Sequence, residues 1–122
     1  MSSLKPIAWL GDSLVRLRQA PADIRSDAGY QLDLVQRGET PADFRPMPDV
    51  GPGAMEIRVH AGSEYRVFYV ARFKEAVYVL HCFQKKSKSG ISTPKEDMDI
   101  IRARLKVAEA LAKELRRGKA HD

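Results

Sequence analysis

The chain has 122 residues, of which 43% are hydrophobic, and its 21 Lys and Arg against 16 Asp and Glu give a net charge of +5. This length and hydrophobic content predict a single domain, residues 1–122, with one core, and they exclude a disordered tail. The positive charge favours an anionic partner without naming it, since a lysine-rich soluble surface produces the same count.

The one cysteine, Cys82, lies in an apolar stretch. A lone cysteine excludes an intramolecular disulfide and a multi-cysteine zinc site, and it fits a reducing compartment. No apolar run has the length of a signal-sequence core or of a membrane span. We therefore expect a cytoplasmic protein with no membrane partner.

Apolar residues between Asp12 and Gly38 recur at three- and four-residue steps, with one break at Pro21, and this pattern predicts a pair of helices. Pro21 suits the first turn of the second helix, and Asp12 or Ser13 can cap the first. Gly38 is a natural stop for the second helix.

The segment Glu39–Ala54 contains four prolines and two glycines, which predicts a structured loop. Alternating apolar and polar residues then predict a strand over Met55–His60 with one wet face. Strands from Tyr65 to about Arg72 and over Ala76–Phe83 complete an antiparallel meander, and Ile7–Leu10 is expected to add an edge strand.

The last predicted element is a basic helix over residues 94–117. Thr93-Pro94-Lys95-Glu96 matches a capping box at its start. A helical stripe of apolar residues follows as far as Leu115, and Gly118 is expected to end the helix.

The sequence lacks the usual hydrolytic motifs. His60, His81 and His121 have no metal-ligand spacing, and there is no Gly-rich phosphate loop or nucleophile elbow. We therefore expect no metal and no cofactor. His60 shares strand parity with Arg58, which favours a ligand-facing position. Parity places His81 with Val77, Val79 and Phe83 and favours packing.

Two arginines, Arg58 and Arg66, lie on strands that the turn Ala61–Glu64 pairs directly, so both can project from one face of the sheet. Like charges this close destabilise the sheet unless carboxylates such as Glu56 or Glu64 neutralise them, or an anion binds between them. Ordinary solvated or ion-paired arginines are the alternative interpretation.

Lys85, Lys86 and Lys88 follow the last strand, in a polar loop that ends at the helix start near Thr93. Because a helix N-terminus favours phosphate, a phosphate group could bind between the lysines and this helix. A dibasic pair at a strand end is also common surface chemistry. Three strand tyrosines, Tyr65, Tyr69 and Tyr78, could stack on bases but are more typical of a core.

An ordered set of short motifs runs along most of the chain. It comprises Lys5-Pro6-Ile7-x-Trp9, Gln36-Arg37-Gly38, Arg45-Pro46-Met47, Val50-Gly51, Glu56-Ile57-Arg58, Tyr65-Arg66-Val67, Tyr69 and Leu80-His81-x-Phe83-x-Lys85-Lys86. In this combination the chain resembles the phage-related HigB-like branch of the RelE toxin superfamily, from roughly Lys5 to Arg104.

The resemblance implies an α+β, RelE-like fold: an N-terminal helix hairpin packed on a small, mostly antiparallel sheet with a concave cationic face, plus a C-terminal helix. It also implies the toxin of a type II toxin-antitoxin system. Members are typically endoribonucleases that cut mRNA, often on the ribosome, and a small antitoxin, commonly a helix-turn-helix protein, holds them inactive.

By position, the resemblance makes Arg66 the transition-state arginine, Arg58 the basic residue of the preceding strand, and Lys85 and Lys86 the strand-end catalytic cations. The implied chemistry is attack of an RNA 2′-hydroxyl on the adjacent phosphate without a metal. Arginine suits charge stabilisation on the phosphate oxygens, and a lysine among other cations suits proton transfer.

Further residues are assigned to RNA binding, namely Glu56, His60, Lys88, Arg116 and Arg117. The last two belong to a basic helix end that could contact ribosomal RNA or an acidic antitoxin, with a solvated helix tail as the alternative. Two other functions stay open: a ParE-like gyrase poison without nuclease activity, and a non-catalytic nucleic-acid-binding regulator.

Overall fold

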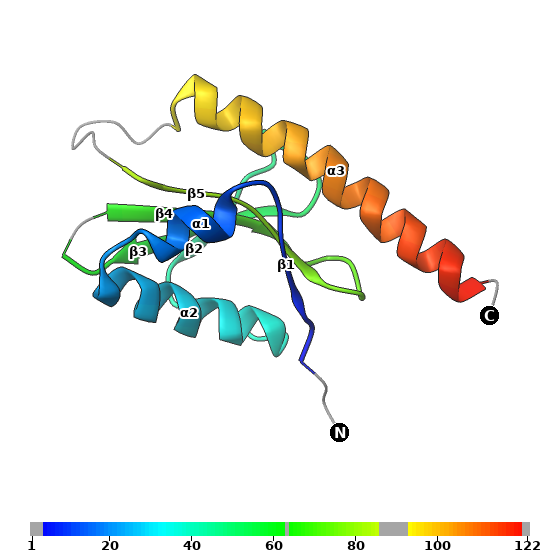
Figure 1. The fold of residues 1–122 in the computed structure, drawn as a ribbon, viewed down its shortest axis with the longest axis horizontal. Helices are drawn as coiled ribbons and strands as arrows, with labels where there is room; N and C mark the ends of the chain where they lie inside the picture. Colours follow the sequence, from blue (N-terminus) through cyan, green and yellow to red (C-terminus); the bar gives the residue numbers. More distant parts are fainter. Residues whose placement is uncertain (1–3, 63, 86–92, 121–122) are drawn as a thin grey trace.

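The structure is a computed structural model that describes residues 4–62, 64–85 and 93–120. The elements in chain order are β1 (Ile7–Trp9), α1 (Ser13–Arg18), α2 (Ala22–Gln36), β2 (Phe44–Pro46), β3 (Ala54–His60), β4 (Glu64–Val70), β5 (Val77–Gln84) and α3 (Lys95–Ala120) (Figure 1). The α+β class is confirmed, and the architecture agrees with the RelE-like fold that the resemblance implies.

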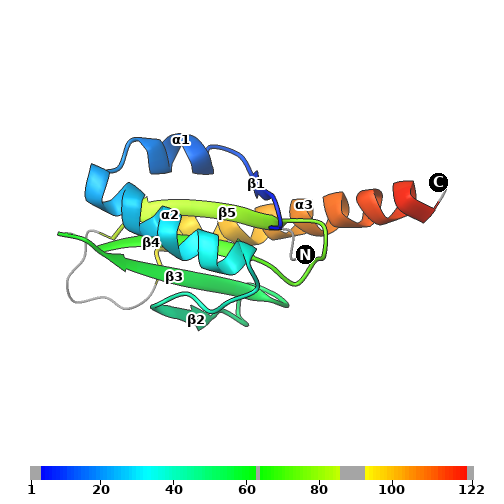
Figure 2. The same ribbon diagram turned by 90° about the horizontal axis from the view of Figure 1, so that it is seen from below.

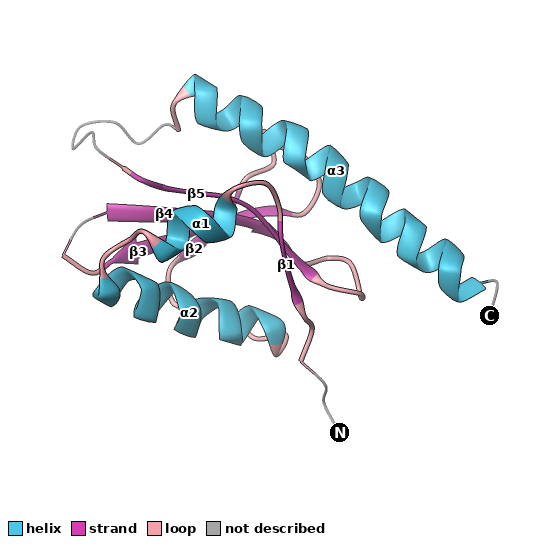
Figure 3. Cartoon of the chain, viewed as in Figure 1, coloured by secondary structure: helices cyan, strands magenta, loops and turns pink. Residues whose placement is uncertain are grey.

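The five strands form one mixed sheet in the order β1-β5-β4-β3-β2. β1 pairs with β5 in parallel, and the other neighbouring strands are antiparallel. The predicted meander is confirmed as β3, β4 and β5, and the predicted edge strand is confirmed as β1. Figure 3 shows the strands in magenta lying between α3 on one side and α1 and α2 on the other.

The first face of the sheet packs against the helix hairpin. Its side chains include Ile57, Val67 and Val79, which form one buried cluster with Ile24 and Leu32 of α2. Successive strand residues point to opposite faces, so the neighbours of these residues are available to the other side. Burial on both faces explains why β4 and β5 are apolar almost throughout.

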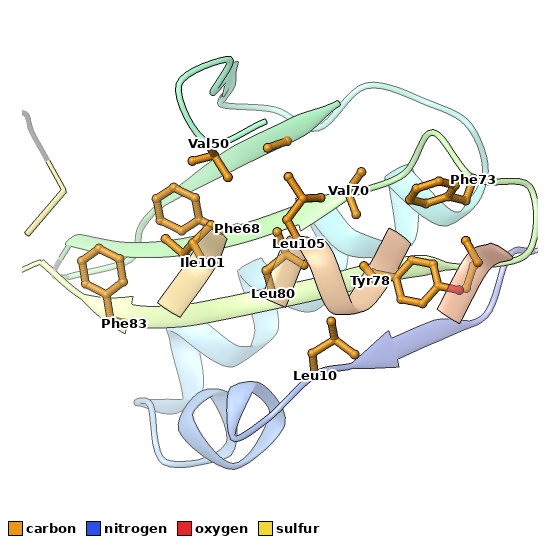
Figure 4. Packing of buried hydrophobic residues seen from close by; sticks show 14 residues of the cluster. Leu10, Val50, Phe68, Val70, Phe73, Tyr78, Leu80, Phe83, Ile101 and Leu105 are labelled. Atoms are coloured by element: carbon orange, nitrogen blue, oxygen red, sulfur yellow. The ribbon is translucent and has the colours of Figure 1, made fainter. Parts of the chain in front are cut away.

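The second face packs against α3. Phe68 and Leu80 of the sheet lie in a cluster with Ile101 and Leu105 of the helix (Figure 4). The apolar stripe predicted for this helix is buried from Ile101 to Ala112, and Met98 at its start is partly buried. Leu115, the last member of the stripe, is exposed, because the C-terminal part of α3 extends beyond the sheet (Figure 2).

The helix hairpin is confirmed, but Asp12 does not cap α1 with its side chain. Its carboxylate instead accepts hydrogen bonds from Arg16 Nε and Arg104 Nη2, both at 2.8 Å. The bond from Arg104 ties α3 to the start of α1. Gly11, with φ +54°, permits this contact, because a Cβ there would collide with the Arg104 guanidinium.

Gly38 ends α2 as predicted. It has φ +82°, its N–H donates to the Val35 carbonyl, and the Glu39 N–H donates to the Leu34 carbonyl. These two bonds form a Schellman motif, which satisfies the carbonyl groups at the helix end. Pro21 lies one residue earlier than predicted, at the N-cap of α2 rather than in its first turn.

Two predictions about regular structure are wrong. The proline-rich segment Glu39–Ala54 contains the short strand β2, which an edge position allows because Pro46 needs no ladder N–H there. Gly118 does not end α3, which runs to Ala120. A glycine inside a helix costs only about 1 kcal/mol relative to alanine, so one glycine does not stop a helix.

Two leucines of α3 provide a test of how this helix packs. Leu105 is buried against the sheet, and Leu111 is exposed on the same helix. Leu105→Ala is expected to lower the free energy of unfolding by about 2–5 kcal/mol because it leaves a cavity. Leu111→Ala is expected to change it by less than about 0.5 kcal/mol. Urea denaturation measures both, and equal losses would contradict the packing of α3.

Candidate nucleic-acid interface

Three arginines on three neighbouring strands meet on the sheet face that α3 covers. Arg58 of β3 lies directly opposite Arg66 of β4, and Arg45 of β2 lies directly opposite Glu56 of β3. Residues opposite one another on neighbouring strands share a face. The predicted pairing of Arg58 with Arg66 across the β3–β4 turn is therefore present in the structure.

The three guanidinium groups converge on one carboxylate, Glu56, whose side chain is only 3% exposed. Arg45 Nε donates to Glu56 Oε1 at 2.9 Å, and Arg58 Nε donates to the same oxygen at 3.3 Å. Arg66 Nε lies 3.6 Å from Oε2. We call Arg45, Glu56, Arg58 and Arg66 the Glu56 cluster.

The arginines of the Glu56 cluster differ in exposure. The side chains of Arg45 and Arg58 are 38% and 31% exposed, whereas that of Arg66 is 8% exposed. Arg66 Nη1 also donates to Glu64 Oε2 at 2.7 Å. Arg45 and Arg58 are therefore accessible to solvent, whereas Arg66 is largely buried.

His60 lies at the edge of the Glu56 cluster. Its Nδ1 lies 2.9 Å from Glu64 Oε1, and its Nε2 lies 2.7 Å from Asp43 Oδ2. The hydrogen bond to Asp43 is the main reason why the pKa of His60 is raised above its ordinary value of 6.5. The pKa of Glu64 is lowered, chiefly by its hydrogen bond with Arg66. His60 shares the ligand-facing side with Arg58, as predicted, but two carboxylates already engage its ring.

The charge balance of this region favours an anion. Arg45, Arg58 and Arg66 face the carboxylates of Glu56 and Glu64, which leaves one guanidinium in excess. At the edge of the cluster the carboxylate of Asp43 faces His60, so the excess positive charge remains when His60 is protonated. Charge-assisted hydrogen bonds from arginine to phosphate are strong, and arginine can bind two oxygens at once. The cluster therefore has the chemistry of a phosphate-binding surface.

Lys85 lies next to this region. Its backbone N–H donates to the Glu64 carbonyl at 2.9 Å, and the preceding pair is Gln84 with Tyr65. Phe83, opposite Arg66, faces α3, so continued alternation assigns Lys85 to the same face. Lys86 and Lys88 lie outside the described residues, so their predicted roles are not placed.

His81 is packed, as predicted, and it shares the face of Phe83, but the prediction that it also shares the face of Val77 and Val79 is wrong. Phe68 pairs with His81 and Tyr69 pairs with Val79, so Leu80 is an extra residue in a β-bulge. The bulge turns His81 away from the face of Val79 and toward α3.

The fully buried His81 makes its side-chain contacts with α3. Its Nε2 lies 2.7 Å from Asp97 Oδ1, and Arg104 Nη1 lies 3.4 Å from Nδ1. An arginine can only donate, so Nδ1 is the acceptor and Nε2 carries the proton of a neutral ring. Burial lowers the pKa of His81, which also favours the neutral form. His81 therefore joins β5 to α3.

The strand tyrosines belong to the core. Tyr65, Tyr69 and Tyr78 are all buried, so base stacking on them is excluded in this conformation. Burial raises the pKa of Tyr69 to about 12. Cys82 is also buried, and burial raises the pKa of its thiol to about 12, so it is neither a ligand nor a nucleophile at neutral pH.

Arg116 and Arg117, predicted to bind RNA, are not part of the Glu56 cluster. They are exposed on the last turns of α3, and Arg117 Nη1 lies 3.7 Å from Glu114 Oε1. These turns extend past the sheet at the end opposite to the β3–β4 turn (Figure 1). The structure does not bring the two arginines to the sheet surface.

Two residues of the site were not predicted from the sequence: Arg45 and Asp43. Both lie at or beside β2, within the segment expected to be an irregular loop. The motif Arg45-Pro46-Met47 was the only feature of the sequence that pointed to Arg45, and the resemblance assigned no function to it. Pairing of β2 with β3 brings Arg45 to Glu56, and the Asp43 carbonyl accepts the Arg58 N–H.

The described residues contain no group of three or more His, Cys, Asp and Glu that could hold a metal ion. None of the described helices combines the length and the apolar character needed to cross a membrane.

Residues 16–106 match the family described as phage derived protein Gp49-like. The chain belongs to this family. The Gp49-like family includes RelE/HigB-like toxins of toxin-antitoxin systems, so the resemblance is confirmed at that level. The matched range of this Gp49-like protein contains the whole Glu56 cluster and Lys85, whereas Arg116 and Arg117 lie beyond it. A search of curated proteins finds no match.

The raised pKa of His60 in this Gp49-like protein is open to direct test by NMR titration of its imidazole. Asp43→Asn is expected to move the pKa of His60 down toward 6.5, because it removes the largest cause of the shift. Asp33→Asn is the control, since Asp33 pairs with Arg37 on α2. A value unchanged by Asp43→Asn would contradict the Asp43–His60 contact.

The same shift predicts a pH dependence of stability. The pKa of His60 is higher in the folded than in the unfolded chain, so its stabilising contribution is complete below about pH 6.5. That contribution is lost as the pH rises through the raised pKa. The difference in free energy of unfolding between the wild type and Asp43→Asn should therefore shrink from pH 6 toward alkaline pH in urea denaturation, and a widening difference would contradict the assigned cause.

Proposed function

We propose that this Gp49-like protein is the toxin of a type II toxin-antitoxin system, of the HigB-like branch of the RelE superfamily, and that it cuts mRNA. The observation that carries the proposal is the convergence of Arg45, Arg58 and Arg66 on the buried carboxylate of Glu56, with Arg45 and Arg58 partly exposed. Membership of a family associated with toxin-antitoxin toxins supports RNA as the anion.

The reaction is attack of an RNA 2′-hydroxyl oxygen on the adjacent phosphorus. The 2′-hydroxyl loses its proton to a base, the bond from phosphorus to the 5′-oxygen breaks, and the departing 5′-oxygen gains a proton. The products are a 2′,3′-cyclic phosphate and a 5′-hydroxyl end. Negative charge grows on the two non-bridging phosphate oxygens during the attack, so cations fixed beside them lower the barrier.

Arg58 and Arg66 are assigned to this charge stabilisation. Arg58 is the better exposed of the two, and its bond to Glu56 uses Nε and leaves the two outer nitrogens free to donate to a phosphate. Arg66 Nη1 is occupied by Glu64, whose side chain is itself well exposed. A phosphate can therefore replace Glu64 as the acceptor of Arg66 when RNA binds, since the two anions compete for the same donor.

Proton transfer is assigned to the lysines after β5. The Lys85 N–H bond to Glu64 holds the Lys85 backbone beside the guanidinium groups. Lys86 keeps its assignment as a second catalytic cation from the resemblance alone. Glu56 positions the arginines, and His60 and Lys88 remain proposed contacts of the RNA around the cut.

The proposed partners follow from the same class of protein. The ribosome supplies part of the RNA's orientation, so cutting of naked RNA is expected to be weak. Arg116 and Arg117, remote from the sheet surface, remain proposed contacts of ribosomal RNA. A small antitoxin, of the helix-turn-helix kind, is the expected inhibitor.

Cleavage of a translated message tests the site. Arg58→Ala and Lys85→Ala are each expected to slow cleavage about 100-fold, because each removes a group that acts in the transition state. Arg37→Ala is the matched control, since Arg37 is an ion-paired, exposed arginine on α2, which covers the other face. The rate is measured by primer extension, with melting temperatures to confirm folding.

Three outcomes would contradict the proposal. Equal cleavage by all variants would remove the Glu56 cluster and Lys85 from the chemistry. Products with a 5′-phosphate would exclude the proposed route. DNA damage with intact mRNA after induction would indicate a gyrase poison, and binding without toxicity would indicate a regulator.

A further inference from the structure

Arg45 has no function assigned from the sequence, yet it holds the strongest contact of the Glu56 cluster. Its Nε bond to Glu56 is 2.9 Å, compared with 3.3 Å for Arg58 and 3.6 Å for Arg66. It is also the most exposed of the three arginines. Its position on β2 extends the row of cations across three strands, from β4 through β3 to the sheet edge.

Arg45 and Arg58 are diagonal neighbours on the sheet. Arg45 lies opposite Glu56, and Arg58 follows Glu56 by two residues on the same face of β3. Diagonal neighbours are within reach of one another when their side chains are long. Both donate through Nε to the same oxygen, Glu56 Oε1, so their guanidinium groups lie side by side.

The outer nitrogens of both guanidinium groups have no acceptor within the described part of the chain. Each arginine has five N–H donors, and only the one at Nε is used in this contact. Arg66 differs, since its Nη1 is bonded to Glu64. The two adjacent guanidinium groups, which share one carboxylate oxygen, can therefore both donate to the non-bridging oxygens of the same phosphate.

An ordinary surface ion pair does not explain this arrangement. In the pair of Arg37 with Asp33, one exposed carboxylate neutralises one arginine. Glu56 and Glu64 already balance the charges of Arg58 and Arg66, so Arg45 brings a positive charge that these two carboxylates leave unmatched. An added cation repels the others unless an anion joins them.

We propose that Arg45 is an RNA-binding residue that, together with Arg58, holds a backbone phosphate, and that Glu56 is the positioning residue for both. The RNA strand then crosses the sheet from β4 toward the β2 edge rather than running along one strand. This inference rests on the proposed function, because it takes the anion to be RNA.

The experiment uses Arg45→Gln in the full-length protein. Glutamine removes the charge but keeps an N–H donor for Glu56, so the fold is expected to persist. Arg37→Gln is the matched control: Arg37 also bonds a carboxylate through Nε at 2.9 Å and is also exposed. The probe is a short single-stranded RNA with methylated 2′-hydroxyls, which cannot undergo the proposed cleavage, and melting temperatures confirm that both variants fold.

Arg45→Gln is expected to weaken RNA binding about fivefold to tenfold at low salt. It should also reduce the slope of the logarithm of the binding constant against that of salt concentration by about 0.7, the value for one phosphate contact on a single strand. Arg37→Gln should change neither quantity. In translated-message assays, Arg45→Gln should cut at least about fivefold more slowly than Arg37→Gln, because it has lost the same contact with the phosphate.

The outcomes separate the inference from the proposed function. If the wild type binds the methylated RNA and Arg45→Gln behaves like Arg37→Gln, the role of Arg45 is overturned while the nuclease stands. If the wild type cuts message but does not bind the naked RNA, the test is the cleavage rate of Arg45→Gln compared with that of Arg37→Gln. Equal rates for these two variants overturn the role of Arg45. If the wild type neither binds nor cuts RNA, the proposed function fails and this inference fails with it.

Discussion

The buried carboxylate of Glu56 is the group on which the candidate nucleic-acid interface depends. A charge out of contact with water is costly unless opposite charges surround it, and Glu56 meets guanidinium groups from β2, β3 and β4. One carboxylate holds three arginines in place but cannot neutralise them. The excess charge remains on the side open to solvent, so the contact that stabilises the cluster also leaves it able to bind an anion.

The rest of the fold keeps that surface in position. The helix hairpin covers one face of the sheet and α3 covers part of the other, so the strands that carry the arginines are packed on both sides. His81, Asp97 and Arg104 join α3 to β5, and Arg104 continues to Asp12 at the start of α1. A row of cations fixed on strands loses little conformational entropy when it binds a phosphate, which favours affinity.

Local patterns in the sequence predicted the elements well and the site in part. Arg58 and Arg66 were placed opposite one another because a short turn determines the pairing of its two strands. Arg45 and Asp43 were missed because pairing of β2 with β3 depends on the path of a proline-rich segment. The face of His81 was mispredicted because alternation fails at a β-bulge, which depends on packing between β4 and β5.

The sequence by itself determined the α+β class, the helix pair, the meander and the excess of cations, since periodicity, glycine and proline positions and charge are properties of neighbouring residues. It also determined the match of residues 16–106 to the Gp49-like family of phage-derived proteins. Only the tertiary structure decided which cations act together. Residues 45, 58 and 66 share one carboxylate because strand pairing brings them together, whereas residues 116 and 117 lie on a helix end beyond the sheet.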